Sequence, residues 1–170
     1  GIDKEIIISD NNSNDGTKNI LKEFKYENVK VLFKDINEGK GSNLKNALLF
    51  AKGDIVIFQD ADLEYNPKDY KDLLIPFLRN RADVVYGSRL TGAKLTKIVG
   101  FPNFIANKII TFFINLLFNR IYSDIETGCK AFKREVLNDL DLVSDGFEIE
   151  VEITTKISAD KNLEIFETPI

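Results

Sequence analysis

The stretch GDIVIFQDADLEYNP, residues 53–67, joins a short apolar run to a cluster of like charges. The apolar run, Ile55–Phe58, predicts a buried strand. Asp60, Asp62 and Glu64 follow it at alternating positions. Carboxylates crowded at the end of a strand repel one another unless a cation or hydrogen-bond donors compensate them. A strand that ends in this way indicates either a cation site or a solvated turn.

Apolar runs and segments of helical period alternate along the chain, which predicts parallel strands joined by helical crossovers. The strands expected from the apolar runs cover residues 5–9, 29–33, 54–58 and 83–87, with weaker ones near 129–132 and 163–167. Helical spacing lies between them, around Ile20–Phe24, around Leu44–Ala51 and from Pro67 to Phe77. The predicted fold class is α/β, in one domain over residues 1–170, because no linker or repeat interrupts the pattern.

Composition excludes several classes of protein. The chain has 170 residues, 44% of them hydrophobic, and a net charge of −4, which argues against a nucleic-acid binder. It contains no His and a single Cys, Cys129, so a disulfide framework and a Cys/His metal cluster are both excluded. The longest nearly apolar stretch, residues 109–118, is half of what a membrane-spanning helix needs, and the N-terminus has no signal-peptide pattern. We therefore expect a soluble, cytoplasmic segment.

The charge is unevenly spread along the chain. No Asp or Glu occurs from Val84 to Ser123, and five basic residues give that stretch a charge of +5, which leaves −9 on the remainder. A locally positive face favours an anionic ligand or an anionic membrane over a neutral one. Residues 103–119 are apolar over most of a helix surface, which is typical of core packing or of an interfacial helix flanked by Lys97, Lys108 and Arg120.

A hard divalent cation would remove the repulsion within the acidic cluster. Mg²⁺ takes oxygen ligands, typically one or two carboxylates, and completes its shell with water and substrate phosphates. Such an ion neutralises and orients a leaving diphosphate. The Asp60 and Asp62 pair therefore predicts a Mg²⁺ or Mn²⁺ site, and the alternative is a solvated turn that leads to the helix at Pro67.

Six blocks, in order along nearly the whole chain, resemble the family-two glycosyltransferases. They are IIISDNNSNDGT (6–17), NEGKGSNLKNAL (37–48), GDIVIFQDADLEYNP (53–67), VVYGSR (84–89), DIETGCKAFKRE (124–135), and FEIEVEI with FETPI (147–170). Within that family they are most similar to the branch of dolichyl-phosphate mannose synthase and related polyprenyl-phosphate sugar transferases.

The resemblance implies a three-layer, Rossmann-like GT-A fold with a mostly parallel sheet flanked by helices. It also implies a GDP- or UDP-sugar donor, a divalent metal and inversion at the anomeric carbon. The family's first strand has no counterpart before Gly1. We therefore expect a fragment of the catalytic domain, incomplete at its N-terminus and open to continuation, including membrane helices, after Ile170.

Carried over by position, the resemblance assigns roles on the donor side. Asp60 and Asp62 match the Asp-x-Asp pair that meets the metal and the donor diphosphate, and Glu64 matches a further metal ligand. Asp10 and Asn11 match the acidic pair that contacts the nucleoside. The second member of that pair is usually Asp, so Asn11 leaves the choice between uracil and guanine open.

Two basic residues are candidates for binding the donor phosphates. Lys40 lies between Gly39 and Gly41, whose lack of a side chain allows close backbone approach, although an ordinary surface turn has the same pattern. Arg89 matches the family's Gly-Ser-Arg, and a guanidinium binds phosphate oxygens bidentately. The alternative for Arg89 is a solvent-exposed side chain at a strand end.

The acceptor is less well defined than the donor. A sugar hydroxyl needs a base, whereas a phosphate monoester is already largely ionised at pH 7, so the absence of His and the basic stretch favour a lipid phosphate. Asp124 and Glu126 match a block near the acceptor, where Asp124 could act as base, and their structural alternative is pairing with Lys130 or Arg120. Lys130 and Glu148 are the remaining acceptor-side candidates.

The leading hypothesis is transfer of a sugar to a polyprenyl phosphate at the cytoplasmic face of a membrane. The second is transfer to a glycan hydroxyl in cell-surface polysaccharide synthesis. An aspartate-based phosphatase is a distant third, because its motif usually follows the first strand of the domain. A non-catalytic domain is the fourth, and the sugar and the oligomeric state stay open.

Overall fold

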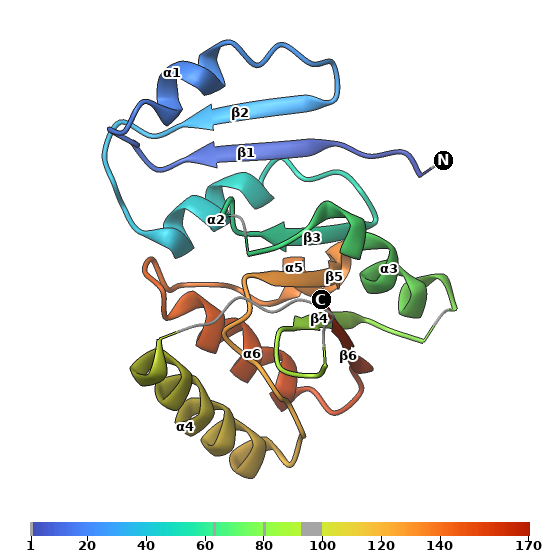
Figure 1. The fold of residues 1–170 in the computed structure, drawn as a ribbon. Coiled ribbons are helices and arrows are strands. Elements are labelled where there is room, and N and C mark those ends of the chain that lie inside the picture. Colours follow the sequence, from blue (N-terminus) through green and yellow to red (C-terminus); the bar gives the residue numbers. More distant parts are fainter. Residues whose placement is uncertain (1, 63, 80, 93–99) are drawn as a thin grey trace. The chain divides into compact units, whose positions relative to one another are not determined.

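The structure is a computed structural model that describes residues 2–62, 64–79, 81–92 and 100–170 (Figure 1). All the strands expected from the apolar runs are present, each within two residues of its predicted bounds. The chain divides into two compact units, one of residues 1–54 and 141–152 and the other of residues 55–140 and 153–170. The expectation of a single domain over residues 1–170 stays a prediction.

The first unit is built on a pair of parallel strands. β1 (Ile6–Asp10) pairs with β2 (Val29–Phe33), with Ile6 opposite Val29 and Asp10 opposite Phe33. Helix α1 (Thr17–Lys22) connects them, and α2 (Lys40–Leu48) packs against β1. Because the strands are parallel, the loops that follow Asp10 and Phe33 leave the same edge of the sheet.

The second unit contains a mixed sheet in the order β3-β5-β4-β6. Its strands are β3 (Ile55–Gln59), β4 (Val84–Ser88), β5 (Cys129–Lys133) and β6 (Ile165–Pro169). β4 and β6 are parallel, whereas β5 runs antiparallel to both β3 and β4.

β5 is the exception in a sheet whose other strands, β3, β4 and β6, run in one direction, as the expectation of a mostly parallel sheet allows. Cys129, the first residue of β5, lies opposite Gln59, the last residue of β3. The chain therefore returns to the sheet at the edge where β3 and β4 end, instead of crossing to the opposite edge. This return brings the loop before β5 next to the acidic loop after β3.

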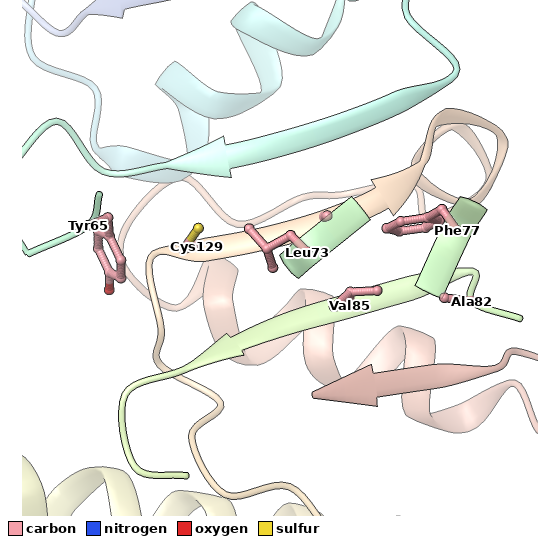
Figure 2. Close-up of a cluster of buried hydrophobic side chains, with 7 residues drawn as sticks. Tyr65, Leu73, Phe77, Ala82, Val85 and Cys129 are labelled. Carbon is pink, nitrogen blue, oxygen red and sulfur yellow. The ribbon is translucent and has the colours of Figure 1, made fainter. Parts of the chain in front are cut away.

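An apolar cluster under helix α3 (Tyr70–Leu78) holds the sheet of the second unit together. Figure 2 shows Leu73 and Phe77 of α3 beside Val85 of β4 and Cys129 of β5. Leu73 and Val85 are fully buried. A short 3₁₀ turn (Pro67–Asp69) precedes α3, with Asn66 capping it through the backbone N–H of Lys68. The acidic loop is thus tied at its far end to a packed helix.

The other helices are α4 (Phe101–Phe118), α5 (Arg134–Asp139) and α6 (Ile149–Ala159). α5 follows β5 and packs against it. α6 buries Ile153 and Ile157, as core packing requires. In α4 the exposed side chains are mostly apolar, so the core-packing interpretation of residues 103–119 is wrong for most of that helix.

Candidate active site

The loop after β3 is held against the loop before β5. The backbone N–H of Asp60 donates to the carbonyl oxygen of Gly128, with an N···O distance of 3.1 Å. The Asp60 carboxylate fills the space of a side chain at position 128, because a Cβ built there would lie 2.2 Å from Asp60 Oδ2. Only a residue without a Cβ leaves room for this carboxylate, so Gly128 sets the position of Asp60.

A buried tyrosine anchors the same contact. Tyr65 is 7% exposed, and its hydroxyl accepts a hydrogen bond from the backbone N–H of Gly128 at 2.7 Å. Burial raises the pKa of Tyr65, so the hydroxyl stays neutral at physiological pH. Tyr65 therefore positions the glycine on which the Asp60 carboxylate rests.

Replacing Tyr65 by Phe tests this anchor. The change leaves the buried Gly128 N–H without its acceptor, and we expect a loss of about 1–2 kcal/mol in the free energy of unfolding. Urea unfolding followed by circular dichroism measures the loss. Tyr26→Phe is the matched control, since Tyr26 is exposed and should change stability little. Equal stability of the two variants would contradict the anchoring role.

The three acidic side chains of the loop have different partners. Asp62 is exposed, and its Oδ1 accepts the backbone N–H of Glu64 at 3.0 Å. The carboxylate of Glu64 instead pairs with Arg89. Within the described residues, no three or more His, Cys, Asp and Glu side chains are arranged as a metal site. Asp60 and Asp62 still supply carboxylate oxygens, which a hard divalent ion prefers.

Arg89 lies between two carboxylates. Its Nε donates to Oδ2 of Asp124 at 2.8 Å and its Nη2 donates to Oδ1 at 3.0 Å, which is a bidentate pair. Its Nη1 donates to Oε2 of Glu64 at 3.1 Å. The Arg89 side chain is only 21% exposed, so the alternative of a freely solvated arginine does not describe it.

The ion pair decides the protonation state of Asp124. Burial alone would raise the pKa of this carboxyl, but the hydrogen bonds and the charge of Arg89 outweigh burial and lower the pKa below its usual range. Burial likewise would lower the pKa of Arg89, and Asp124 reverses that effect. A carboxylate held ionised in this way is a weak proton acceptor, which disfavours Asp124 as a general base.

Two side chains of helix α4 extend the hydrogen-bond network of the Arg89–Asp124 pair, and the sequence pattern did not single them out. Asn107 donates from Nδ2 to Oδ1 of Asp124 at 2.7 Å, and both residues are buried. Thr111 donates from Oγ1 to Oδ1 of Asn107 at 2.9 Å. The available signal was the repeat of polar residues every four positions, Asn103, Asn107, Thr111 and Asn115, in a mostly apolar helix. Asp124 thus contacts Arg89 and Asn107, whereas the expected partners were Lys130 or Arg120.

The remaining acceptor-side candidates of this unit lie in or beside the loop before β5. Lys130 is fully buried, its Nζ donates to the carbonyl oxygen of Thr127 at 2.8 Å, and it lies 5.3 Å from the ring centre of Tyr86. This geometry makes Lys130 a support for the loop. Glu126 is partly exposed in the same loop. Roles for Lys130 and Glu126 toward an acceptor stay predictions.

The first unit contains the candidates for the nucleoside. Asp10 is buried, and its Oδ2 accepts the backbone N–H of Ser13 at 3.1 Å. Asn11 donates from Nδ2 to Oδ1 of Asn37 at 2.8 Å and accepts the backbone N–H of Glu38 at 3.1 Å. Asn11 therefore links the loop after β1 to the loop after β2. Its side-chain amide is neutral, and it donates one of these hydrogen bonds and accepts the other.

Lys40 and Glu148 also belong to the first unit. Lys40 begins α2, and its Nζ lies 2.7 Å from Oε1 of Glu150. Its neighbours Gly39 and Gly41 pass so close to Asp145 and Ser144 that a Cβ on either would be 2.3 Å from a backbone oxygen. Close backbone packing within the protein therefore explains these glycines. Glu148 is exposed and accepts the backbone N–H of Gly146.

Comparison with known proteins identifies the family. Residues 1–141 match the family described as Glycosyl transferase family 2. This match covers well over half of the chain, so the chain belongs to glycosyl transferase family 2. The assignment made from the six sequence blocks is confirmed, and with it the class of enzyme, a glycosyltransferase.

Two relatives and one solved structure are similar over nearly the whole chain. Agl6, a low-salt glycan biosynthesis hexosyltransferase of Haloferax volcanii, is 29% identical over 98% of this chain and 39% of that protein. A dolichol-phosphate mannosyltransferase of Pyrococcus furiosus is 30% identical over 97% of this chain and 47% of that protein. The chain spans less than half the length of these two relatives.

The solved structure is glucosyl-3-phosphoglycerate synthase from Mycobacterium tuberculosis, in complex with Mn²⁺, UDP and phosphoglyceric acid. It matches with a TM-score of 0.65 at 22% identity, over 99% of this chain and 58% of that one. A likeness at this identity concerns the fold. The expected GT-A fold is confirmed, with a mixed sheet.

Proposed function

We propose that the protein transfers a hexose from a nucleotide-diphosphate sugar to a polyprenyl phosphate, with a divalent metal. The similarity to a dolichol-phosphate mannosyltransferase supports the lipid acceptor. The observation that carries the proposal is the Arg89–Asp124 pair, because the two hydrogen bonds from Arg89 keep the Asp124 carboxylate ionised and make it a poor base for a neutral hydroxyl acceptor. A phosphate nucleophile needs no base, since its second pKa is near 6.

Asp60 and Asp62 would hold the metal, Mg²⁺ or Mn²⁺, which when bound supplies positive charge for the diphosphate. Gly128 fixes Asp60 for this role. Glu64 has two alternative partners in this proposal: Arg89, as observed, and the metal, as the family resemblance implies. Arg89 would turn its Nη1 from Glu64 to the donor diphosphate and stay oriented by the two hydrogen bonds to Asp124.

The other assigned roles are part of the same proposal. Asp10 and Asn11 would contact the nucleoside, and Lys40 would contact the donor phosphates once it leaves Glu150. Inversion at the anomeric carbon follows if the acceptor phosphate attacks in line with the departing diphosphate. The expected location is the cytoplasmic face of a membrane.

The experiment offers two labelled donors, GDP-mannose and UDP-glucose, to the protein with Mn²⁺ and one acceptor at a time. We expect transfer to a short polyprenyl phosphate, and none to the matched polyprenyl alcohol, which lacks the ionised nucleophile. EDTA should abolish transfer, and Mn²⁺ should restore it. Thin-layer chromatography of the lipid product measures each result.

Transfer to an oligosaccharide, with the polyprenyl phosphate inert, would refute the lipid acceptor. That result would favour a glycan hydroxyl as acceptor, in line with the similarity to Agl6. Full transfer in EDTA would refute the metal. Hydrolysis of a simple phosphate ester without sugar transfer would instead favour the phosphatase hypothesis.

A further inference from the structure

Helix α4 buries two polar side chains, Asn107 and Thr111, and exposes most of its apolar side chains. Its buried residues are Asn107, Thr111 and Ile114. Phe112, Leu116 and Leu117 are 61%, 66% and 73% exposed. The helix of a water-soluble domain normally has the reverse arrangement. In Figure 1, α4 is the long yellow to olive helix at one side of the second unit.

The exposed apolar side chains form one continuous surface, which we call the α4 outer face. It consists of Phe101, Ile105, Ile109, Phe112, Phe113, Leu116 and Leu117. From Ile105 onward the spacings of three and four residues place these side chains on one side of the helix. A contiguous apolar patch of this kind marks a binding surface, whereas single exposed apolar residues are ordinary.

Hydrogen bonds fix the orientation of α4 and keep the outer face outward. Asn107 is bonded to Asp124 near the first half of the helix. At the other end, Asn115 Nδ2 donates to the carbonyl oxygen of Tyr122 at 2.9 Å, and its Oδ1 accepts the Tyr122 N–H at 2.8 Å. Rotating α4 to bury the outer face would break all of these contacts. The exposed face is therefore a stable feature of the unit.

Among the described residues, α4 is also the one helix long and apolar enough to cross a membrane, with a mean hydropathy of 1.4, which corrects the expectation that the longest apolar stretch is too short for this. A spanning orientation would separate Asn107 from the buried Asp124 and carry Lys108 into hydrocarbon. A helix that lies parallel to the membrane surface keeps the hydrogen bond of Asn107 to Asp124 and leaves Lys108 outside the hydrocarbon, because only the outer face then needs an apolar environment. An interfacial position is the one that fits both faces of the helix.

The charge of the chain around α4 favours an anionic partner for the outer face. The stretch from Val84 to Ser123 has no acidic residue, and besides Arg89, whose charge is paired with Asp124 and Glu64, it has four basic residues. Of these four, Lys108 and Arg120 belong to the described residues, and Lys94 and Lys97 lie outside them. The Nζ of Lys108 lies 5.7 Å from the ring centre of Phe104 and donates to the carbonyl oxygen of Ser123 at 3.2 Å, so this charge is held at the side of the helix. A second copy of the chain would bring two positive stretches together, whereas an anionic membrane carries the complementary charge.

We propose that the α4 outer face binds the surface of an anionic membrane, with the helix axis parallel to that surface. The link from this surface to a lipid acceptor rests on the proposed function. The binding of the outer face to a membrane does not rest on the proposed function, and it is measured without donor, metal or acceptor. Failure of the transfer assay and failure of membrane binding are thus separate results.

Sedimentation with vesicles tests the surface. We expect the protein to sediment with phosphatidylcholine vesicles that contain 30% phosphatidylglycerol, and at least tenfold less with pure phosphatidylcholine. The double variant Phe112→Ser, Leu116→Ser should lower binding to the anionic vesicles at least tenfold. The matched control is Leu49→Ser, Leu78→Ser, which removes two other exposed leucines and should bind as the parent does.

A tryptophan reporter gives a second readout that does not depend on the serine variants folding. The chain contains no Trp, so Phe113→Trp introduces a single indole on the outer face. Its emission should shift to the blue with anionic vesicles, and that of Leu78→Trp should not. No shift at position 113 would overturn the proposal.

Two other results would also overturn it. One is equal binding of the parent and the Phe112→Ser, Leu116→Ser variant to anionic vesicles. The other is a dimer in analytical ultracentrifugation that the same variant dissociates, because the outer face would then be covered by a second copy of this chain.

Discussion

Replacing Asp124 by Ala is expected to lower the free energy of unfolding by about 3 kcal/mol, because removing one member of a buried ion pair leaves the other uncompensated. Asp124 is fully buried and accepts hydrogen bonds from Arg89 and from Asn107. The value lies at the low end for such pairs, since Arg89 keeps its contact with Glu64. Urea unfolding followed by circular dichroism measures it.

An exposed ion pair in the same unit is the matched control. Lys133 pairs with Asp83 at 2.7 Å, and the Lys133 side chain is 38% exposed. Lys133→Ala should therefore cost no more than about 1 kcal/mol. A loss for Asp124→Ala as small as that for Lys133→Ala would mean that the buried Arg89–Asp124 pair stabilises the fold no more than an exposed one.

Lowering the pH should reduce the difference in the free energy of unfolding between the parent protein and the Asp124→Ala variant. The pKa of Asp124 is lowered in the folded protein, so its contribution is fully present above the ordinary carboxyl value of 3.8. As the pH falls through the folded pKa, below 3.8, Asp124 becomes protonated and that contribution is lost. The two proteins should then approach each other in stability, provided that both are still folded.

The strands could be predicted from the sequence, but the direction of one of them could not. Apolar runs such as Ile55–Phe58 are local signals, and they placed β3 within one residue. The antiparallel course of β5 depends on where α4 and the following loop return the chain to the sheet. That path includes side-chain contacts with the loop, such as those of Asn115 with Tyr122, which apolar spacing does not reveal.

The sequence likewise predicts only part of the candidate site. Asp60, Asp62 and Arg89 follow strands and match a known motif, so they could be found from the sequence alone. The partner of Arg89 could not, because Asp124 lies 35 residues further along the chain. Asn107 is hidden within an apolar run, and its meaning depends on which face of α4 is buried. Side-chain contacts over such separations are a property of the fold.

The largest expected effect on ligand binding is that of Gly128→Ala. The added Cβ would lie 2.2 Å from Oδ2 and 2.6 Å from Cγ of Asp60, distances that real Cβ atoms essentially never show. The carboxylate is the mobile end of its side chain, so it would rotate away while the backbone contact at 3.1 Å holds the loop in place. The variant should fold, with Asp60 turned out of its position.

Displacing a metal ligand in this way should weaken Mn²⁺ binding in the presence of GDP or UDP by about 10- to 100-fold. Electron paramagnetic resonance of free Mn²⁺ measures the affinity directly, without any sugar transfer. Gly100→Ala is the matched control, because the atoms nearest to a Cβ at position 100 are 4.0 Å away. It should bind Mn²⁺ as the parent does.

A double-mutant cycle separates a specific clash from a general loss of structure. Gly128→Ala should cost about 1–3 kcal/mol of unfolding free energy in the parent, as overpacking of a tight contact does. It should cost clearly less in an Asp60→Ala background, where the clashing carboxylate is gone. Equal costs in both backgrounds would place the strain elsewhere in the loop. Unchanged Mn²⁺ affinity in Gly128→Ala would remove Asp60 from the proposed metal site.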